Sequence, residues 1–362
     1  MTVWPDTRRC GSQPYQRRCS ALRTREVIWT GRRFQDIRHN RARTPPDRRR
    51  GVYQRWQRVV VEAGLVLPGE DPGLVVSGDD FLLERHPVNV DALPVVVSVP
   101  HYGIGSPRKF AVEEFATRLG HHLAYGYADD YAAELYGHLH DIGATVIATQ
   151  LSRLFVDVNR PRDDFSVEDG VVYSKTGAVR THSRRDTPIF AEPPDHAEAE
   201  FRLRQFYDPY YSALNRCLQA RADTFGHVVL LDAHTANARR MGNHQVILGT
   251  SRGRTASPEL VDVIGATFIQ HGFDVQLNVP GYGGANIVRS FGAHQRDRTE
   301  AVQIEINAGL LQTLDHDAFI KTQIDGIRPA PDMATLTRLR ACMEELVVAC
   351  DGYARSIANR SG

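Results

Sequence analysis

The stretch VVVSVPHYG, Val95 to Gly103, decides the fold class. Its first five residues are almost all apolar, which is typical of a β-strand that is covered on both faces, as in a parallel sheet. Pro100 follows this run, and His101 comes directly after it. Because ligands bind beyond the carboxyl ends of the strands in such sheets, the stretch predicts a buried strand that ends at a functional histidine.

Segments of the same kind recur along the chain and alternate with helical patterns. Helices are expected at 113–123, 131–143, 200–226 with a break near Pro209, 257–272 and 333–357, and strands at 144–152, 155–159, 227–235, 243–251 and 301–311. Alternating strands and helices predict an α/β protein: a three-layer αβα fold with a mostly parallel central mixed sheet.

Residues 1–58 differ in composition from the rest of the 362-residue chain. They hold 16 arginines and only four acidic residues, with few apolar residues to form a core. We expect a disordered N-terminal extension over 1–58 and a single domain over 59–362. Clustered arginine can bind nucleic acid, but a solvated tail or a wrongly assigned start codon explains it as well, and no nucleic-acid partner is expected.

The composition also indicates in which cellular compartment the protein is expected. The five cysteines are odd in number and form no CxxC pair, which indicates neither a disulfide framework nor a zinc ribbon. No apolar run reaches the roughly 18 residues of a membrane span, and the basic N-terminus lacks the apolar core of a secretory signal. We expect a cytoplasmic protein with no membrane partner, while its oligomeric state is left open.

Polar side chains also come at the ends of two other predicted strands. His234 ends the run VVLLDAH, and Asn159 and Arg160 end the run FVDVNR. Two histidines at one sheet edge are suitable zinc ligands, and a catalytic zinc ion usually takes three protein ligands. The candidates for a third ligand are carboxylates: Asp129, Asp130, Glu113 and Glu114.

Further charged residues are candidates for catalysis and substrate binding. Glu305 lies in the apolar run AVQIEI, and a glutamate there is either a general base or the partner of an arginine. Asp232 either orients His234 or faces away from it. Arg160 can hold a substrate carboxylate in a bidentate pair, and Arg153 can hold a second carboxylate or stabilise an oxyanion.

The order of these motifs resembles the N-formylglutamate amidohydrolase family, also called N-formylglutamate deformylases. The resemblance covers roughly residues 94–311, and it rests on VSVPHYG, ADDYAAELY, LSRLFVDVNRPRDD, RQFYDPYYSAL, LLDAHT, GYGGANIVRSFG and AVQIEIN. It implies a fold like that of zinc carboxypeptidases and hydrolysis of the formyl amide of N-formyl-L-glutamate, a step of histidine degradation. It therefore implies that the 59–362 domain is a catalytic amidohydrolase domain whose substrate is a small carboxylate.

The resemblance also implies roles for individual residues. His101, Asp129 and His234 match the metal-ligand positions, so Zn²⁺ or another divalent metal is expected as the cofactor. Glu305 matches a general base, with Arg153 beside the reacting group. Asn159 and Arg160 match a pair that binds a substrate carboxylate, and Tyr102 and Arg289 are expected to line the substrate pocket.

The chain departs from the family pattern at some pocket positions. Tyr102 stands where the family usually has serine, Asp130 where a tryptophan is common, and Val288 where a threonine is usual. These differences leave open another N-acyl amino acid, or a short peptide with a free carboxylate, as the substrate. A ligand-binding or nucleic-acid-binding protein without catalysis is the remaining alternative.

Overall fold

Four parallel strands form the centre of the structure, a computed structural model that describes residues 74–77, 81–105, 115–116, 126–293, 298–325 and 327–361. Nearly all their residues are buried, as expected for strands covered on both faces. The strand predicted from VVVSV is confirmed and lies inside the sheet. In order across the sheet, the four are β4 (Thr145–Thr149), β3 (Val95–Val99), β7 (Val228–Ala236) and β10 (Thr299–Asn307).

Shorter strands extend this parallel centre on both sides, and most of them are antiparallel to it. Among the described residues, eight strands form one sheet in the order β1-β2-β4-β3-β7-β10-β8-β9, and β5 and β6 form a separate hairpin. The predicted mixed sheet with a parallel centre is confirmed. The remaining strands are β1 (Leu74–Ser77), β2 (Leu82–Arg85), β5 (Ser166–Glu168), β6 (Val171–Tyr173), β8 (Val246–Gly249) and β9 (Val275–Leu277).

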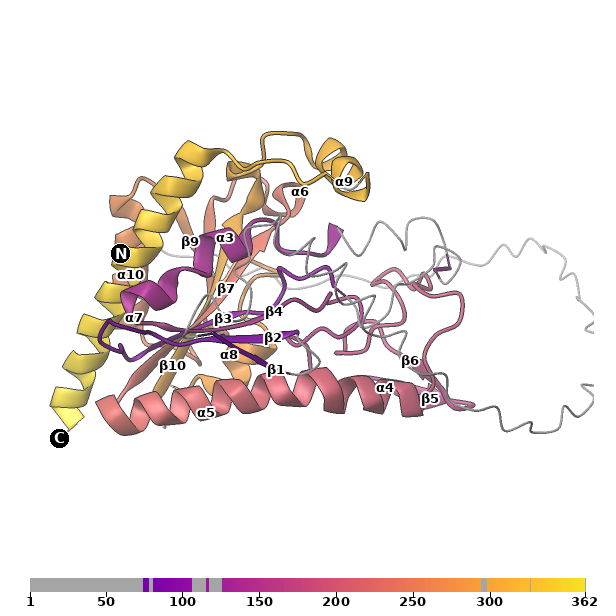
Figure 1. Cartoon of the computed structure of the whole chain (residues 1–362), viewed down its shortest axis with the longest axis horizontal. Coiled ribbons are helices and arrows are strands. Elements are labelled where there is room, and N and C mark those ends of the chain that lie inside the picture. The colour runs from indigo at the N-terminus through magenta and orange to yellow at the C-terminus, as the bar shows by residue number, and fades with distance from the viewer. Residues whose placement is uncertain are drawn as a thin grey trace, which may run out of the picture. The chain divides into compact units, whose positions relative to one another are not determined.

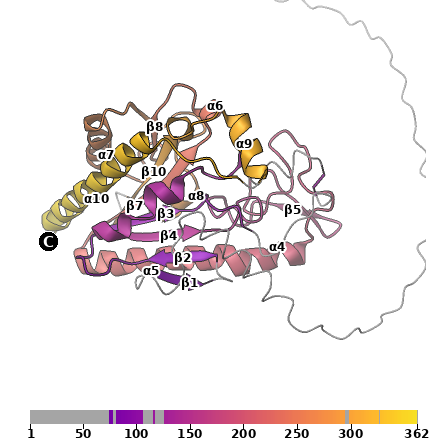
Figure 2. The same cartoon turned by 45° about the horizontal axis from the view of Figure 1, so that its top comes forward.

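Helices cover both faces of the sheet and complete three layers. The helices of the described part are α3 (Ala132–Tyr136), α4 (His196–Arg202), α5 (Asp208–Phe225), α6 (Ala238–Met241), α7 (Pro258–Gln270), α8 (Asn286–Phe291), α9 (His316–Ile324) and α10 (Met333–Ser361). The long helix α5 lies along one face, and α3, α7 and α10 lie on the other (Figure 1). The turned view in Figure 2 shows strands of the sheet between α5 and α10. The predicted αβα architecture is confirmed.

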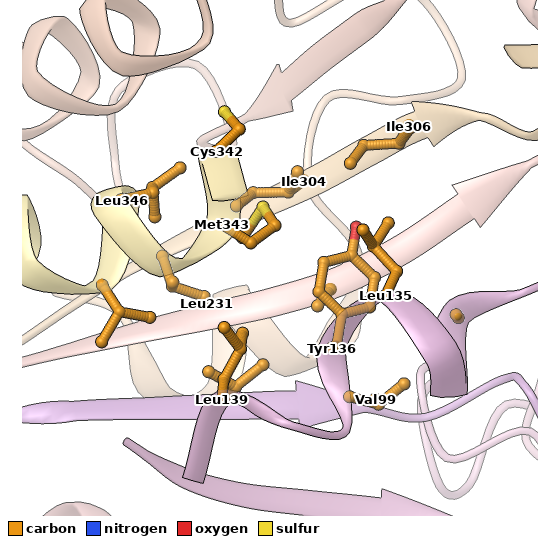
Figure 3. Packing of buried hydrophobic residues seen from close by; sticks show 14 of the residues in the cluster. Val99, Leu135, Tyr136, Leu139, Leu231, Ile304, Ile306, Cys342, Met343 and Leu346 are labelled. Carbon is orange, nitrogen blue, oxygen red and sulfur yellow. The ribbon is translucent and has the colours of Figure 1, made fainter. Parts of the chain in front are cut away.

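The larger apolar core lies between the sheet and the α3–α10 layer. Figure 3 shows side chains of β3, β7 and β10 packed against those of α3 and α10. Each fully buried large apolar side chain contributes about 1.5–3 kcal/mol to the free energy of unfolding, relative to the same side chain left exposed. Tyr136 reaches through this cluster, and its hydroxyl donates a hydrogen bond to the backbone carbonyl of His234 at 2.9 Å. The core therefore fixes the end of β7 that carries a candidate site residue.

The helix predicted around Pro209 continues through the proline instead of breaking there. Helix α4, a π-helical segment at Leu203–Tyr207 and α5 follow one another without a gap. Pro209 lies in the first turn of α5, where its missing N–H is tolerated. The expected break is therefore wrong, because the wider π turn accommodates the proline.

Some predicted segments differ from the structure or lie beyond the part that it describes. The strand predicted at 155–159 is wrong, because this segment forms turns in which the N–H of Phe155 bonds to the carbonyl of Ser152 at 2.9 Å. Its apolar side chains are buried as in a strand, which explains the misleading pattern. The extension 1–58 lies outside the described residues. Of the helix predicted at 113–123 the structure describes Phe115 and Ala116, and the prediction is wrong there, because Phe115 forms a β-bridge with Phe190. None of the described helices combines the length and apolar character needed to cross a membrane.

Candidate metal centre and active site

Three neighbouring parallel strands bring the main site residues to one edge of the sheet. His101 lies two residues after the end of β3, whereas His234 and Glu305 each lie two residues before the end of their strands, β7 and β10. The strand predicted at 227–235 is confirmed with a shift of one residue, because β7 continues to Ala236. His234 and Glu305 are direct partners in the parallel register, so their side chains leave the same face of the sheet.

His101, Asp129 and His234 form a compact group of potential metal ligands. One ligand atom from each lies within 4.8 Å of the others, and all three residues are buried. Nδ1 of His234 lies 2.8 Å from Oδ2 of Asp129, and Nδ1 of His101 lies 3.9 Å from the same oxygen. The backbone supports this placement, because the N–H of Asp129 donates to the carbonyl of His101 at 2.9 Å.

The chemistry of this group fits a divalent metal ion. Nδ1 of His101 is buried and has no hydrogen-bond partner in the protein, which is costly unless a ligand engages it. Two imidazole nitrogens and one carboxylate oxygen are a common catalytic zinc ligand set. The donors of His101, Asp129 and His234 are therefore suited to hold such an ion.

Carboxylates on the far side of each imidazole orient the two histidines. Nε2 of His101 lies 2.8 Å from Oδ1 of Asp157, and Nε2 of His234 lies 3.1 Å from Oδ2 of Asp232. Such outer carboxylates turn the opposite ring nitrogen toward a metal. Asp232 thus faces His234, which resolves the alternative that the sequence left open.

Electrostatics differ between the two imidazoles. Burial and the charge of Arg153 lower the pKa of His101 to about 4, so its ring is neutral and ready to act as a ligand. Burial also opposes charge on His234, but the surrounding carboxylates of Asp232 and Glu305 raise its pKa well above the ordinary value. Metal binding at this site must therefore release a proton from His234.

The alternative third ligands are placed differently. Asp130, the neighbour of Asp129, accepts a hydrogen bond from Gln312 at 2.7 Å and is not part of the ligand group. Burial raises the pKa of Asp130 to about 7. Glu113 and Glu114 lie outside the described residues. Of the carboxylates that the structure describes, Asp129 is the one that meets both histidines.

Asp157 is the centre of an arginine cluster beside the two histidines. Arg153 donates from Nε and NH2 to Oδ2 of Asp157 at 3.1 and 2.7 Å. The guanidiniums of Arg160 and Arg180 approach the same oxygen at 3.8 and 3.7 Å. Burial opposes charge on Asp157, yet Arg153 and His101 hold its pKa well below the usual range. The carboxylate of Asp157 thus faces three guanidiniums, of which Arg153 also approaches Asp129, with its NH1 3.9 Å from Oδ1.

Glu305 is buried beside the ligand group. It is 8% exposed, and the amide of Gln303 donates a hydrogen bond to its Oε1. Burial raises the pKa of Glu305 to about 7. Among the described residues no arginine forms an ion pair with it, so the structural alternative, a glutamate paired with arginine, has no support in these contacts.

Three of the residues expected to bind substrate differ in their surroundings. The amide of Asn159 donates to Asp232 at 2.8 Å and lies 2.9 Å from Nε2 of His234, and its oxygen accepts from the N–H of Ile287. These contacts place the amide of Asn159 between Asp232, His234 and the backbone of Ile287. Tyr102 packs against the α3–α10 core. Arg289 is exposed on α8, outside the ligand group.

Sequence reasoning missed two residues of this site. Asp157 lies in FVDVN, where a strand assignment drew attention to the residues after it, yet its buried charge between apolar neighbours was a usable signal. Arg180 lies in an irregular segment of a chain with 41 arginines, and nothing in the sequence distinguishes it. Its importance follows only from the tertiary contact with Asp157.

A second group of potential ligands lies elsewhere, between β2 and α5. It consists of Glu84, His86 and Cys217. Arg216 donates to both carboxylate oxygens of Glu84, at 2.7 and 2.8 Å. Because a guanidinium already neutralises this carboxylate, the contacts favour an ion pair here over a metal site.

The chain is similar to known proteins in sequence and in fold. Residues 93–311 match the sequence model of the N-formylglutamate amidohydrolase family. The N-formylglutamate deformylase of Pseudomonas putida is 30% identical over 227 residues, which cover 59% of this chain and 80% of the relative. The crystal structure of N-formylglutamate amidohydrolase from Ralstonia eutropha JMP134 superposes with a TM-score of 0.62 at 23% identity, covering 76% of this chain and 98% of that one.

Proposed function

The chain belongs to the N-formylglutamate amidohydrolase family and is a hydrolase of carbon–nitrogen bonds, and on that premise we propose that it is metal-dependent and converts N-formyl-L-glutamate and water to L-glutamate and formate. The observation that carries the proposal is the convergence of His101, Asp129 and His234, whose ligand atoms lie within 4.8 Å of one another. The adjacent arginine cluster supports an anionic substrate. A cytoplasmic location and a part in histidine degradation stay predictions.

His101, Asp129 and His234 would hold the metal ion. When bound, a divalent ion there would supply Lewis-acid activation of water and of the formyl carbonyl. Asp157 and Asp232 keep the two imidazoles oriented for this purpose. The fit rests on the donor set and on the unpartnered Nδ1 of His101.

Glu305 would act as the general base and then as the general acid. As a carboxylate it accepts a proton from the attacking water while the oxygen–carbon bond to the formyl group forms. It then delivers that proton to the nitrogen of glutamate as the carbon–nitrogen bond breaks. The group must be charged before the first transfer, and it is neutral before the second because it then holds the proton of the water.

The arginines would bind the charges of the substrate. NH1 of Arg153 forms no hydrogen bond to Asp157 and lies 3.9 Å from Oδ1 of Asp129, and it would stabilise the oxyanion that develops beside the ligand group. Arg160 approaches Asp157 loosely and retains donors for the α-carboxylate of the substrate.

Formate release tests the proposal directly. The purified full chain, loaded with Zn²⁺ and with its metal content measured, is incubated with N-formyl-L-glutamate, and formate is quantified. We expect release by the wild type, and loss of both bound metal and activity in His234→Ala. The control Arg185→Gln changes an exposed arginine of the segment before α4 and should behave as the wild type. Full activity after removal of all metal would overturn the proposed metal dependence, and no formate release would overturn the substrate.

A further inference from the structure

The arginine cluster holds more positive charge than the protein neutralises. Asp157 is the carboxylate that Arg153, Arg160 and Arg180 share, and it is also engaged by His101. All three guanidiniums are largely buried, with side chains 17%, 22% and 11% exposed, respectively. Burial of arginine without matched carboxylates is costly, so an anionic ligand is expected to complete the cluster.

Arg180 is the least exposed of the three. Its Nε is buried and has no hydrogen-bond partner, and its NH2 approaches Asp157 no closer than 3.7 Å. Arg153, in contrast, already forms two hydrogen bonds to Asp157. Burial and repulsion by Arg153 lower the pKa of Arg180 despite its proximity to Asp157. The guanidinium thus retains donors in a place that favours an added negative charge.

The backbone around Arg180 is held rigidly against the site. The N–H of Asp157 donates to the carbonyl of Ala178 at 2.8 Å, and the N–H of Ala178 donates to the carbonyl of Pro161 at 3.1 Å. Val179, the residue before Arg180, is completely buried. Its guanidinium also lies 5.5 Å from the ring of Tyr127. Such preorganisation is what a residue needs in order to bind a substrate group selectively.

The charges of the cluster match a substrate with two carboxylates. Arg153 is matched by Asp157 and by Asp129, whose Oδ1 lies 3.9 Å from its NH1, so Arg160 and Arg180 are the two guanidiniums of the cluster that retain donors for a carboxylate each. Arg160 is assigned to the α-carboxylate and Arg153 to the developing oxyanion, which leaves Arg180 for a second, distal carboxylate. A neutral side chain at that position would leave a buried guanidinium unpaired.

We propose that Arg180 is the specificity-determining residue that binds the side-chain carboxylate of the substrate, and that it makes this enzyme prefer acidic over neutral N-formyl amino acids. The inference rests on the proposed function, and it assigns to Arg180 the second-carboxylate role that the sequence gave as one option for Arg153. Arg180 acts on the side chain of the substrate, not on the bond that breaks. Its loss should therefore change the selectivity more than the chemistry.

N-formyl-L-glutamine provides the matched substrate, because it replaces only the distal carboxylate by a neutral amide of the same shape. Values of kcat/KM are measured for both substrates with the metal-loaded wild type, Arg180→Met, Arg180→Lys and the control Arg185→Gln. In Arg180→Met we expect kcat/KM for N-formyl-L-glutamate to fall about 30-fold or more, while that for N-formyl-L-glutamine changes by a few-fold. Arg180→Lys should retain part of the preference, because it keeps the charge but loses the fork.

A binding measurement keeps the inference testable without turnover. Glutarate and butyrate, a dicarboxylate and a monocarboxylate of similar length, are titrated calorimetrically into the wild type and Arg180→Met. Preferential glutarate binding that disappears in Arg180→Met supports the inference even if N-formyl-L-glutamate is not hydrolysed. An unchanged preference for glutamate over glutamine and for glutarate over butyrate in Arg180→Met overturns it, and equal loss of both substrates assigns Arg180 a structural role instead.

Discussion

In the variant Glu305→Gln we expect activity and stability to change in opposite directions. Glutamine keeps the shape of glutamate but cannot accept a proton from water. The loss of a general base typically reduces the rate by about 10²–10⁴-fold. Since Glu305 contributes no ligand atom to the group of His101, Asp129 and His234, the variant should retain its metal.

The stability effect follows from burial of Glu305. Burial raises its pKa from the ordinary 4.5 to about 7, so the folded protein binds this proton more tightly than the unfolded chain does. The free energy of unfolding therefore falls as the pH rises from 4.5 through about 7. At about 1.4 kcal/mol for each tenfold change in proton affinity, the full loss is roughly 3 kcal/mol. Glutamine carries no charge, so the metal-free variant avoids this loss.

Two measurements test these expectations. Thermal unfolding of metal-free wild type and variant should differ at about pH 8, with the variant more stable, and should converge near pH 4, where Glu305 is neutral in both states. In the metal-loaded wild type, kcat/KM should rise with pH through an apparent pKa below about 7, because the positive charge of the ion favours the carboxylate. Glu192→Gln, at an exposed glutamate, is the matched control for both assays.

The expected loss of activity and the expected gain of stability each have an outcome that would refute them. A Glu305→Gln protein that retains its metal and full activity would show that another group accepts the proton. Equal stability of the two metal-free proteins at about pH 8 would show that Glu305 is not a destabilising buried charge. The two results are independent, so the roles in catalysis and in folding are tested separately.

Two further substitutions probe the charges around the site and the opposite end of the sheet. Asp157→Asn removes the carboxylate behind His101 and the negative charge that three guanidiniums share, so metal affinity measured by calorimetric titration should fall about 10–100-fold; unchanged affinity would contradict the role of Asp157 as the orienting group. Tyr353→Phe removes a hydrogen bond to the buried Glu300 and should lower the free energy of unfolding by about 1–3 kcal/mol in a denaturant titration. Burial opposes charge on Glu300, but hydrogen bonds from His227 and Tyr353 lower its pKa. The stability that these hydrogen bonds give to the folded protein is lost as the pH falls below 4.5, so the variant should unfold at a higher pH than the wild type during acid titration. An unchanged acid midpoint would argue against this role of Tyr353.

Much of the fold was predictable because its central strands are continuous apolar runs. Such runs in β3, β7 and β10 require cover on both faces, and this places His101, His234 and Glu305 at one edge of a parallel sheet. The sequence predicts these three strands well because burial on both faces requires apolar residues at nearly every position.

The remaining part of the site depends on contacts that no local pattern contains. Asp157 meets His101 across 56 residues of sequence, and it lies in a buried turn whose composition imitates a strand. Asn159 looked like a substrate ligand because it precedes Arg160, yet its amide is enclosed by β7 and α8. Arg180 is recognised only by the charges that surround it in the folded protein.

The π-helical segment at Leu203–Tyr207 joins α4 and α5 without a gap. The i→i+5 hydrogen bonds of this segment hold one residue more per turn than an α-helix does, so α4 and α5 keep nearly the phase of an uninterrupted helix. Deletion of one residue here would restore regular α geometry and should therefore leave Ala199 and Arg202 on their present buried face. The hydroxyl of Tyr207, which donates to the carbonyl of Arg160 at 2.9 Å, lies in the same segment, so the choice of the deleted residue decides whether that contact survives.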